Sequence, residues 1–451
     1  MTIIENFAAD LAGMDYGAAD PVVRSAVDNH ILDTVAATLA GSATEDGRGI
    51  LCLRSDKPGN AQIKALGTGP LDDVASWCAM TRLSEIDDIH LSSGTTPGSI
   101  VVPSAIVLSK HMGVTDAALF ASAVMAGYEA MTRLGAAADG QSLVYKGVWT
   151  TYFAAPLGTA AVTARLLQLS PNDTAHAIAI ALTMLSGRMG QPGSEKTARW
   201  LTAGHAARMG SFAAVSAAEG FRGDLGLIDR DWFEKAQGIE IDRAAFTPER
   251  GRSVVPDISI KPYCSAKQMI GAIAGFEELL ASGIDAGAIE KILVSVPENY
   301  AAMIDHGVVT GNRLSSVTSA PYQLAQAAYN IDGLFDVARS EYKLSDDVTG
   351  LMDKVSVAVD ADLAKHLPAN WPARVDVTAN GKTRSVTIID APGDPGAPFD
   401  AARVLQKFHQ FVDPLIGEAD ATAWAAPASN AASDDAALSE LQDKYLAIGS
   451  A

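Results

Sequence analysis

The sequence predicts a mainly α-helical protein with a second, smaller α+β domain. Up to about residue 257, apolar residues recur at helical spacing within long, alanine-rich segments. From 258 to 395, short β-branched runs with period-two alternation are interleaved with helical stretches. Beyond 396 the helical pattern returns, and this C-terminal segment is expected to pack against the first domain. We therefore predict a helical domain of residues 1–257 and 396–451, and an α+β domain of residues 258–395.

Capping residues and turn formers mark the helices of the first domain. A helix from Pro21 to Gly41 has Asp20 as its cap and a glycine at its end. The helix expected from Thr115 to Leu134 has Thr115 as its cap and Asp116 near its start. The remaining helices are expected at Asp72–Ser84, Ser99–His111, Thr151–Leu169, Asp173–Ser186 and Ala198–Gly220.

The strands of the second domain are short, and Asn380-Gly381 between the last two is a strong signal for a tight β-hairpin. The expected strands are Lys291–Val296, Lys354–Asp360, Ala373–Thr378 and Thr383–Ile389. The expected helices are Lys267–Ser282, Ser319–Tyr329 and Asp346–Met352. A proline- and glycine-rich linker follows at 391–398, and then helices at Asp400–Phe411 and Asp434–Leu446. The Ala/Ser/Asp-rich stretch Ala421–Ala437 is the weakest candidate for fixed structure.

Composition restricts the classes of partner and compartment. The net charge of −19 over 451 residues repels phosphate backbones, which argues against nucleic acid. Neither a signal peptide nor a sufficiently long apolar run is found, so no membrane span is expected. Three scattered cysteines give no disulfide framework, in keeping with a cytoplasmic protein. Charged residues make up only 19% of the chain, which favours surface buried between the subunits of a homodimer.

The segment from Leu83 to Pro103 is the strongest candidate for a site. It places Glu85, Asp87, Asp88 and His90 within six residues, and a polar Ser-Ser-Gly-Thr-Thr stretch and a Pro-Gly break follow. One alternative is a solvated helix end. Apolar residues interleave with the acids, however, and their burial is expected to draw the carboxylates into the wall of a cleft.

Basic and phenolic residues gather in three further short segments, around 145–149, 196–205 and 259–268. In so acidic a protein they suggest an anion-binding cleft at the domain junction, where arginine recognises carboxylates and lysine supplies a compact charge or a base. Surface roles remain open for Lys146 and Lys196, and a surface ion pair for Arg199, while His205 is expected to be packed. No phosphate loop or nucleophile elbow is found. The residues concerned are Tyr145, Lys146, Lys196, Arg199, Lys261, Tyr263 and Lys267.

In combination and order, several motifs resemble those of the MmgE/PrpD family, whose members include dehydratases, decarboxylases and epimerases of polycarboxylates. The motifs are E-I-D-D-I-H and T-T-P-G-S, then G-V-W-T-T-Y-F-A-A-P-L-G, R-W-L-T-A-G-H-A-A-R-M-G, I-K-P-Y at 260–263, and A-P-Y-Q-L-A around Tyr322. The resemblance covers nearly the whole chain. It implies a helical domain built from both chain ends, a smaller α+β domain, a homodimer, a cleft between the domains, and no cofactor. Asp87, Asp88 and His90 could form a partial metal site, but no matching His/Cys cluster occurs elsewhere in the sequence, so no metal is expected.

This sequence departs from the dehydratase and decarboxylase pattern at several positions. Their histidines correspond to Thr96, Trp149, Thr202 and Ala266, and their lysine corresponds to Arg199. A dehydratase protonates a leaving hydroxyl and a decarboxylase protonates a carbanion, and histidine is the usual donor. The family positions retained are Glu85, Asp87, Asp88, His90, Lys261 and Tyr322.

We therefore predict a cofactor-independent epimerase or racemase that acts on a small polycarboxylate. Iminodisuccinate is the best candidate, because this branch resembles the family's epimerase of that compound. The predicted catalytic residues are Lys261, Tyr145, Asp88 and His90, and the predicted substrate-binding residues are Lys146, Arg199, Lys267, Asp87, Glu85 and Tyr322. One alternative is a 2-methylcitrate dehydratase-like or cis-aconitate decarboxylase-like lyase. The other is a helical dimer that binds carboxylates without turnover.

Overall fold

A computed structural model describes residues 1–53, 69–185, 187–188, 197–247, 252–309, 312–339 and 344–449. The chain divides into two compact units. One consists of Met1–Gly190, Thr197–Ile258 and Asp400–Ala451, and the other contains Ser259–Phe399. The first is helical and the second combines helices with a sheet, so the predicted fold class is confirmed.

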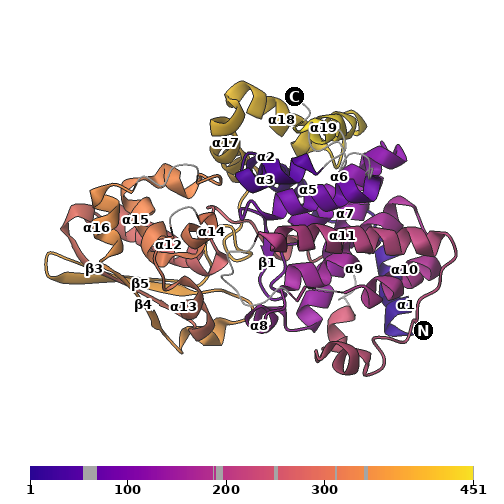
Figure 1. Ribbon diagram of the computed structural model, residues 1–451, viewed down its shortest axis with the longest axis horizontal. Helices are drawn as coiled ribbons and strands as arrows, with labels where there is room; N and C mark the ends of the chain where they lie inside the picture. The colour runs from indigo at the N-terminus through magenta and orange to yellow at the C-terminus, as the bar shows by residue number, and fades with distance from the viewer. Residues whose placement is uncertain are drawn as a thin grey trace. The chain divides into compact units, whose positions relative to one another are not determined.

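The helical unit is assembled from long α-helices, which Figure 1 labels. Within it, the short strand β1 (Ile89–His90) follows α5. After α11 come a π-helical turn, η1 (Phe233–Gln237), and two 3-10 turns, η2 (Arg243–Phe246) and η3 (Val255–Asp257). The helices before residue 259 are α1 (Ile3–Ala12), α2 (Pro21–Ser42), α3 (Glu45–Cys52), α5 (Pro70–Arg82), α6 (Gly98–Met112), α7 (Ala117–Ala137), α8 (Gly140–Tyr145), α9 (Thr150–Leu166), α10 (Pro171–Thr183) and α11 (Ala198–Ala218).

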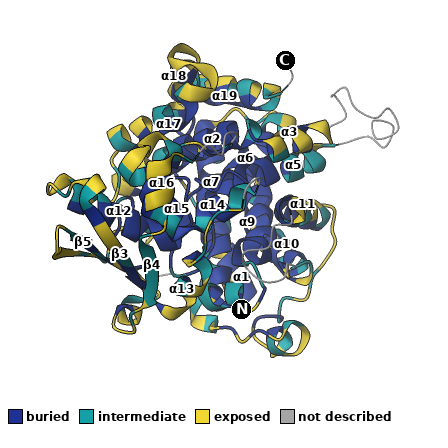
Figure 2. Ribbon diagram, turned by 60° about the vertical axis from the view of Figure 1, so that its left-hand side comes forward, coloured by how far each residue is buried: buried dark blue, intermediate teal, exposed yellow. Residues whose placement is uncertain are grey.

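Helices α6, α7 and α9 form the centre of this unit and are buried along most of their length (Figure 2). Small residues allow their close approach. A Cβ on Gly127 of α7 would lie 2.6 Å from Val162 Cγ2 of α9, and one on Gly204 of α11 would lie 2.0 Å from the Ala75 carbonyl oxygen of α5. The alanine- and glycine-rich composition is therefore what lets these backbones pack so tightly.

The C-terminal segment packs on the N-terminal helices of the same unit, as α17 (Ala401–Ile416), α18 (Glu418–Asn430) and α19 (Asp435–Ala447). The Tyr445 hydroxyl of α19 lies 2.7 Å from the Thr38 hydroxyl of α2. The expectation that Ala421–Ala437 has little fixed structure is wrong, because most of it lies in α18 and α19 and Ala421, Ala425 and Ala428 are buried. Alanine is a strong helix former, and its small side chain suits a tight interface.

The second unit contains a four-stranded mixed sheet in the order β4-β3-β5-β6. The strands β3 (Ile289–Val296) and β4 (Val355–Val359) are parallel, whereas β5 (Ala373–Ala379) and β6 (Lys382–Ile388) form an antiparallel hairpin. Asn380 and Gly381 both have positive φ at its turn, as the Asn-Gly signal predicts. Helix α12 packs on β5 and β6, and α15 packs on α12 and α16. The helices are α12 (Lys267–Ala281), α13 (Glu298–Ile304), α14 (Arg313–Thr318), α15 (Ala320–Tyr329) and α16 (Asp346–Met352).

Helix caps explain the small differences between predicted and observed boundaries. The cap of α7 is Asp116, which accepts a 2.9 Å hydrogen bond from the Leu119 amide, so the choice of Thr115 is wrong. Helix α10 ends at Thr183, and Ser186, its predicted end, lies outside the described residues.

None of the helices in the described part of the chain combines the length and apolar character that crossing a membrane requires.

Candidate active site

The acidic segment follows the end of α5 and enters β1, which pairs with β2 (Ile258–Ser259). Glu85 has a φ of 62°, a left-handed conformation that turns the chain sharply after the helix. Ile86 is fully buried, and Asp87 and Asp88 are fully buried beside it. The carboxylates thus lie inside the protein, and the alternative of a solvated helix end does not hold.

Asp88 is held by groups from three parts of the helical unit. Its Oδ1 accepts a 2.8 Å hydrogen bond from the Gly98 amide at the start of α6. Its Oδ2 accepts a 2.7 Å hydrogen bond from the Tyr128 hydroxyl of α7 and lies 2.9 Å from Nδ1 of His30 in α2. With both oxygens engaged and no exposure to solvent, this carboxylate is suited to fixing the segment in place.

A chain of buried ion pairs runs through the other acids. Arg82 Nη1 lies 3.0 Å from Glu85 Oε2 and 3.3 Å from Asp87 Oδ1. The second oxygen of Glu85, Oε1, accepts a 2.7 Å hydrogen bond from Nη2 of Arg199 in α11. Glu85 therefore bridges two guanidinium groups, and all four side chains are almost completely buried.

Two indole rings fix the plane of the Arg199 guanidinium. Its central carbon lies 4.4 Å from the centre of the Trp149 ring and 4.0 Å from that of Trp200. Stacking of this kind suits arginine, whose charge is delocalised over a flat group, better than the compact ammonium of lysine. The cation is thus held in one orientation before any ligand arrives.

Three buried donors of this cluster have no acceptor among the residues that the structure describes: Arg82 Nε, Arg199 Nε and the Tyr152 hydroxyl. Burial raises the pKa of Tyr152, so its phenol remains protonated at neutral pH. Buried polar groups normally have partners, so donors left over beside a cationic pair indicate an acceptor-rich, anionic ligand.

His90 is a neutral imidazole at physiological pH. Burial, and next the positive charge of Arg133, lower its pKa to about 4. Its Nδ1 lies 2.9 Å from the Ser93 hydroxyl. Such a histidine can accept a proton or share a hydrogen bond, but it is not an imidazolium donor at pH 7. No group of three or more His, Cys, Asp or Glu side chains that could hold a metal occurs in the described part of the chain.

The predicted residues Tyr145 and Lys146 lie at the end of α8. Tyr145 is half-buried, whereas Lys146 is exposed. Lys196, from the second basic segment, lies outside the described residues. His205 is exposed on α11, so the expectation that it is packed is wrong.

Lys261, Lys267 and Tyr322 belong to the second unit, and all three are buried. Lys267 Nζ is hydrogen-bonded to the fully buried Asp394. Burial lowers the pKa of Lys267, the nearby Lys261 charge acts in the same direction, and Asp394 opposes them. Tyr322 lies in the first turn of α15, with the guanidinium carbon of Arg339 5.9 Å from its ring centre.

Two family models match the chain. The MmgE/PrpD N-terminal domain matches residues 5–238, and the MmgE/PrpD C-terminal domain matches residues 263–430. The chain belongs to the MmgE/PrpD family. It is similar to the cis-aconitate decarboxylase-like protein oryM of Aspergillus oryzae, at 25% identity over 366 residues, 74% of this chain and 73% of that protein. It is also similar to the cis-aconitate decarboxylase of Aspergillus terreus, at 28% identity over 199 residues, which span 41% of this chain and 40% of that protein.

Within this MmgE/PrpD fold, the positions expected to carry histidine in dehydratases and decarboxylases hold other groups. Thr96 is buried, and its hydroxyl lies 3.0 Å from that of Thr151. Trp149 packs against the Arg199 guanidinium, Thr202 is half-buried on α11, and Ala266 precedes α12 without a capping side chain. None of the four can donate a proton as an imidazolium does.

Sequence reasoning missed Arg82, Tyr152 and the partners of Asp88. Arg82 stands three residues before Glu85 at the end of a predicted helix, and this i,i+3 spacing is a usable signal for an ion pair. Tyr152 stands three residues after Trp149, within a motif already singled out by the family resemblance. Tyr128 and His30 carry no local signal, because only the tertiary fold brings them to Asp88.

Proposed function

We propose that this protein is a cofactor-independent epimerase that removes and returns a proton next to a carboxylate of a small polycarboxylate, with iminodisuccinate as its substrate. The observation that carries the proposal is the fixed Arg199 guanidinium, stacked between two indoles and joined through Glu85 to Arg82. A protein of net charge −19 that buries two guanidinium groups and leaves donors open beside them is suited to a carboxylate ligand.

The chemistry of epimerisation fits such a site. When a base takes the α-proton, the electron pair of the C–H bond moves into the adjacent carboxylate and forms an enediolate, which carries more negative charge than the substrate. Fixed donors that face this charge stabilise the transition state without having to reorganise. We assign this role to Arg199, with Arg82 and the Tyr152 hydroxyl as further donors. Returning the proton to the opposite face completes the epimerisation.

The proposed acid/base groups are Lys261 and Tyr145. Lys261 is buried, and it lies close enough to Lys267 for the two side chains to interact electrostatically. Because Asp394 balances the Lys267 charge, we propose that Lys267 positions Lys261 and does not itself hold a carboxylate.

Asp88 acts in the proposal as a positioning residue, because both its oxygens are occupied. Glu85 and Asp87 orient the two arginines, and His90 contributes as a neutral hydrogen-bonding group. Lys146 and Tyr322 remain proposed substrate contacts.

Solvent isotope exchange tests the proposal. Incubation with each stereoisomer of iminodisuccinate in heavy water should place deuterium at the α-position as the isomers interconvert, and proton NMR and chiral chromatography measure both. Lys261→Ala should abolish exchange while circular dichroism stays unchanged. Lys291→Ala, an exposed lysine of the same unit, is the matched control and should retain exchange. Absence of both exchange and interconversion with every stereoisomer overturns the assignment.

A lyase is the second candidate, favoured by the names of the two Aspergillus relatives. It predicts released carbon dioxide from cis-aconitate, or an absorbing alkene from 2-methylcitrate, without stereoisomer interconversion. The same fixed arginines would then stabilise the carbanion that decarboxylation leaves. Parallel assays of the three compounds separate the reactions, and the loss of imidazole at Thr96 and Trp149 is the reason we place epimerisation first.

A further inference from the structure

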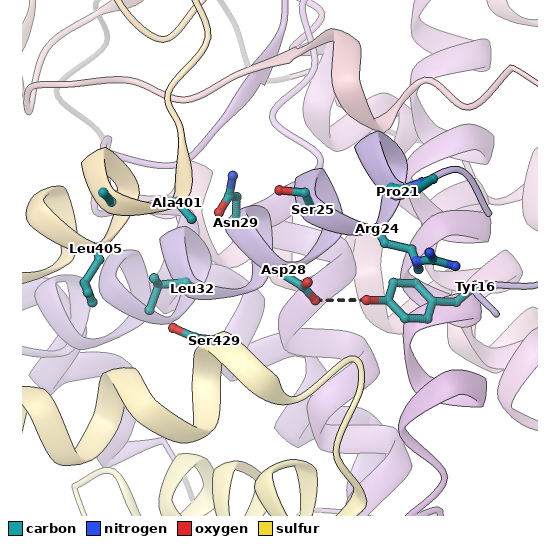
Figure 3. Close-up of a pocket in the computed structure, with 11 residues that line it drawn as sticks. Tyr16, Pro21, Arg24, Ser25, Asp28, Asn29, Leu32, Ala401, Leu405 and Ser429 are labelled. Atoms are coloured by element: carbon teal, nitrogen blue, oxygen red, sulfur yellow. Dashed lines mark hydrogen bonds between the residues drawn. The ribbon is translucent and has the colours of Figure 1, made fainter. Parts of the chain in front are cut away.

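A hollow of about 550 Å³ lies in the helical unit between α2, the start of α17 and the end of α18 (Figure 3). Its volume falls in the range of small-molecule sites. None of the residues assigned to the reaction above lines it, so its chemistry has to be explained separately.

One face of α2 lines the hollow with a basic, an acidic and an apolar side chain, in that order along the helix. Arg24, Asp28 and Leu32 follow one another at four-residue steps, so they line the same side of the helix about 6 Å apart. Figure 3 shows Leu32 between Asp28 and Leu405, with Arg24 on the opposite side of Asp28. The lining therefore runs from a cation, through an anion, to an apolar end formed by Leu32 and Leu405.

The charged groups of the hollow are only partly satisfied. Within the described part of the chain, Asp28 accepts a single 3.2 Å hydrogen bond, from the Tyr16 hydroxyl, and Arg24 donates a single one, at 3.2 Å, to the Gly17 carbonyl. No ion pair joins Arg24 to Asp28 among these residues. Burial raises the pKa of Asp28 to about 6, although the Tyr16 hydrogen bond and the nearby Arg24 charge act in the opposite direction. A cationic group placed against Asp28 would offset that desolvation.

We propose that this hollow binds an aliphatic α-amino acid as its zwitterion, with the carboxylate on Arg24, the ammonium on Asp28 and the side chain against Leu32 and Leu405. A ligand with one charge would leave either Arg24 or Asp28 unmatched. A purely polar zwitterion would leave the exposed Leu405 side chain facing water. Arg24 also lies near the N-terminus of α2, where the helix dipole favours a carboxylate.

Calorimetric titration of the full chain with L-leucine tests this directly. We expect saturable binding, and at least tenfold weaker binding of three analogues that each lack one element: 3-methylbutylamine without the carboxylate, 4-methylpentanoate without the ammonium, and glycine without the side chain. Equal binding of the analogues, or no saturable binding of leucine, overturns the proposal.

Variants separate the three contacts. Arg24→Gln, Asp28→Asn and Leu405→Asp should each weaken leucine binding at least tenfold, whereas Gln406→Asp, an exposed change next to Leu405 on α17, should leave it unaltered.

Leucine binding should also weaken as the pH falls from 7 to 5, because Asp28 becomes protonated, and this dependence should vanish in Asp28→Asn. If leucine never binds and Leu405→Asp instead lowers the molecular mass in solution, the face is an interface between copies of the chain and the proposal fails. These readouts use no turnover, so they are independent of the proposed epimerase activity.

Discussion

Tyr128 of α7 donates a 2.7 Å hydrogen bond to Asp88, a carboxylate 40 residues earlier in the chain, and neither side chain is exposed. The same carboxylate binds the first amide of α6, at Gly98. A Cβ on Gly98 would lie 2.6 Å from Asp88 Oδ2, so this position admits only glycine without a shift of the segment. Asp88 thereby connects the acidic segment to α6 and α7, so its replacement should lower the free energy of unfolding.

Tyr128→Phe should lower the free energy of unfolding by roughly 1.5–3 kcal/mol, because the hydrogen bond it removes goes to a charged, buried group. Asp88→Asn should lower it further, since its amide nitrogen must face a donor. Urea unfolding of both single variants and the double variant gives the coupling, expected at about 1–3 kcal/mol. Asp10→Asn, an exposed position on α1, is the control. Strict additivity of the two changes would contradict the direct contact.

Lys407→Met should be strongly destabilising. Lys407 of α17 is paired with Asp33 of α2 and donates a 2.8 Å hydrogen bond to the Ile86 carbonyl, and both charged groups are buried. Removing one partner leaves an uncompensated charge in the interior, which costs about 3–5 kcal/mol. Lys407→Met combined with Asp33→Leu should recover a large part of this loss. Lys110→Met, which breaks a partly exposed ion pair with Asp443, should cost less than about 1 kcal/mol in the same unfolding assay.

His90 should make the protein less stable in mild acid. The pKa of His90 is about 4 in the folded state and about 6.5 in the unfolded chain. Between these two pH values, His90 is therefore protonated in the unfolded chain and neutral in the folded protein. The contribution is complete above pH 6.5 and is lost as the pH falls from about 6.5 to 4, by roughly 1–3 kcal/mol. Urea unfolding from pH 7 to pH 4 measures it. His90→Gln, which cannot gain the charge, should flatten this part of the profile, while the exposed His205→Gln should not. Equal slopes for His90→Gln and the parent protein would contradict the prediction.

Local chemistry explains what could be predicted from the sequence. Proline and capping residues locate α2, and the Asn-Gly pair locates the β5–β6 turn, because each acts within a few residues. Interleaved isoleucines correctly indicate that Asp87 and Asp88 are interior.

The remaining features depend on contacts between distant parts of the chain. Lys407 is paired with Asp33, 374 residues earlier in the chain, and no local sequence pattern predicts this ion pair. Trp200 is the neighbour of Arg199 in the chain, but Trp149 comes from the start of α9, so the second indole could not be foreseen from the segment that contains Arg199. Helix α18 was not predicted because its alanine-rich composition is also typical of flexible segments. Its buried alanines pack against other helices, and the local sequence does not reveal this packing.

Arg199→Lys should show whether the stacked guanidinium supports turnover. Lysine preserves the charge but loses the planar group that lies between Trp149 and Trp200, so the substrate carboxylate would meet a misplaced cation. We expect kcat/KM for iminodisuccinate epimerisation to fall at least 100-fold, about 2.7 kcal/mol of transition-state stabilisation. Arg208→Lys is the matched control, because Arg208 lies on the same helix and makes a half-exposed 2.8 Å ion pair with Asp72. Tyr152→Phe removes one open donor with little change in packing, and should lower kcat/KM less than Arg199→Lys does, while circular dichroism stays that of the parent. Full activity of Arg199→Lys beside an unaltered Arg208→Lys would show that the stacked arginine is structural, and would remove the observation on which the epimerase proposal stands.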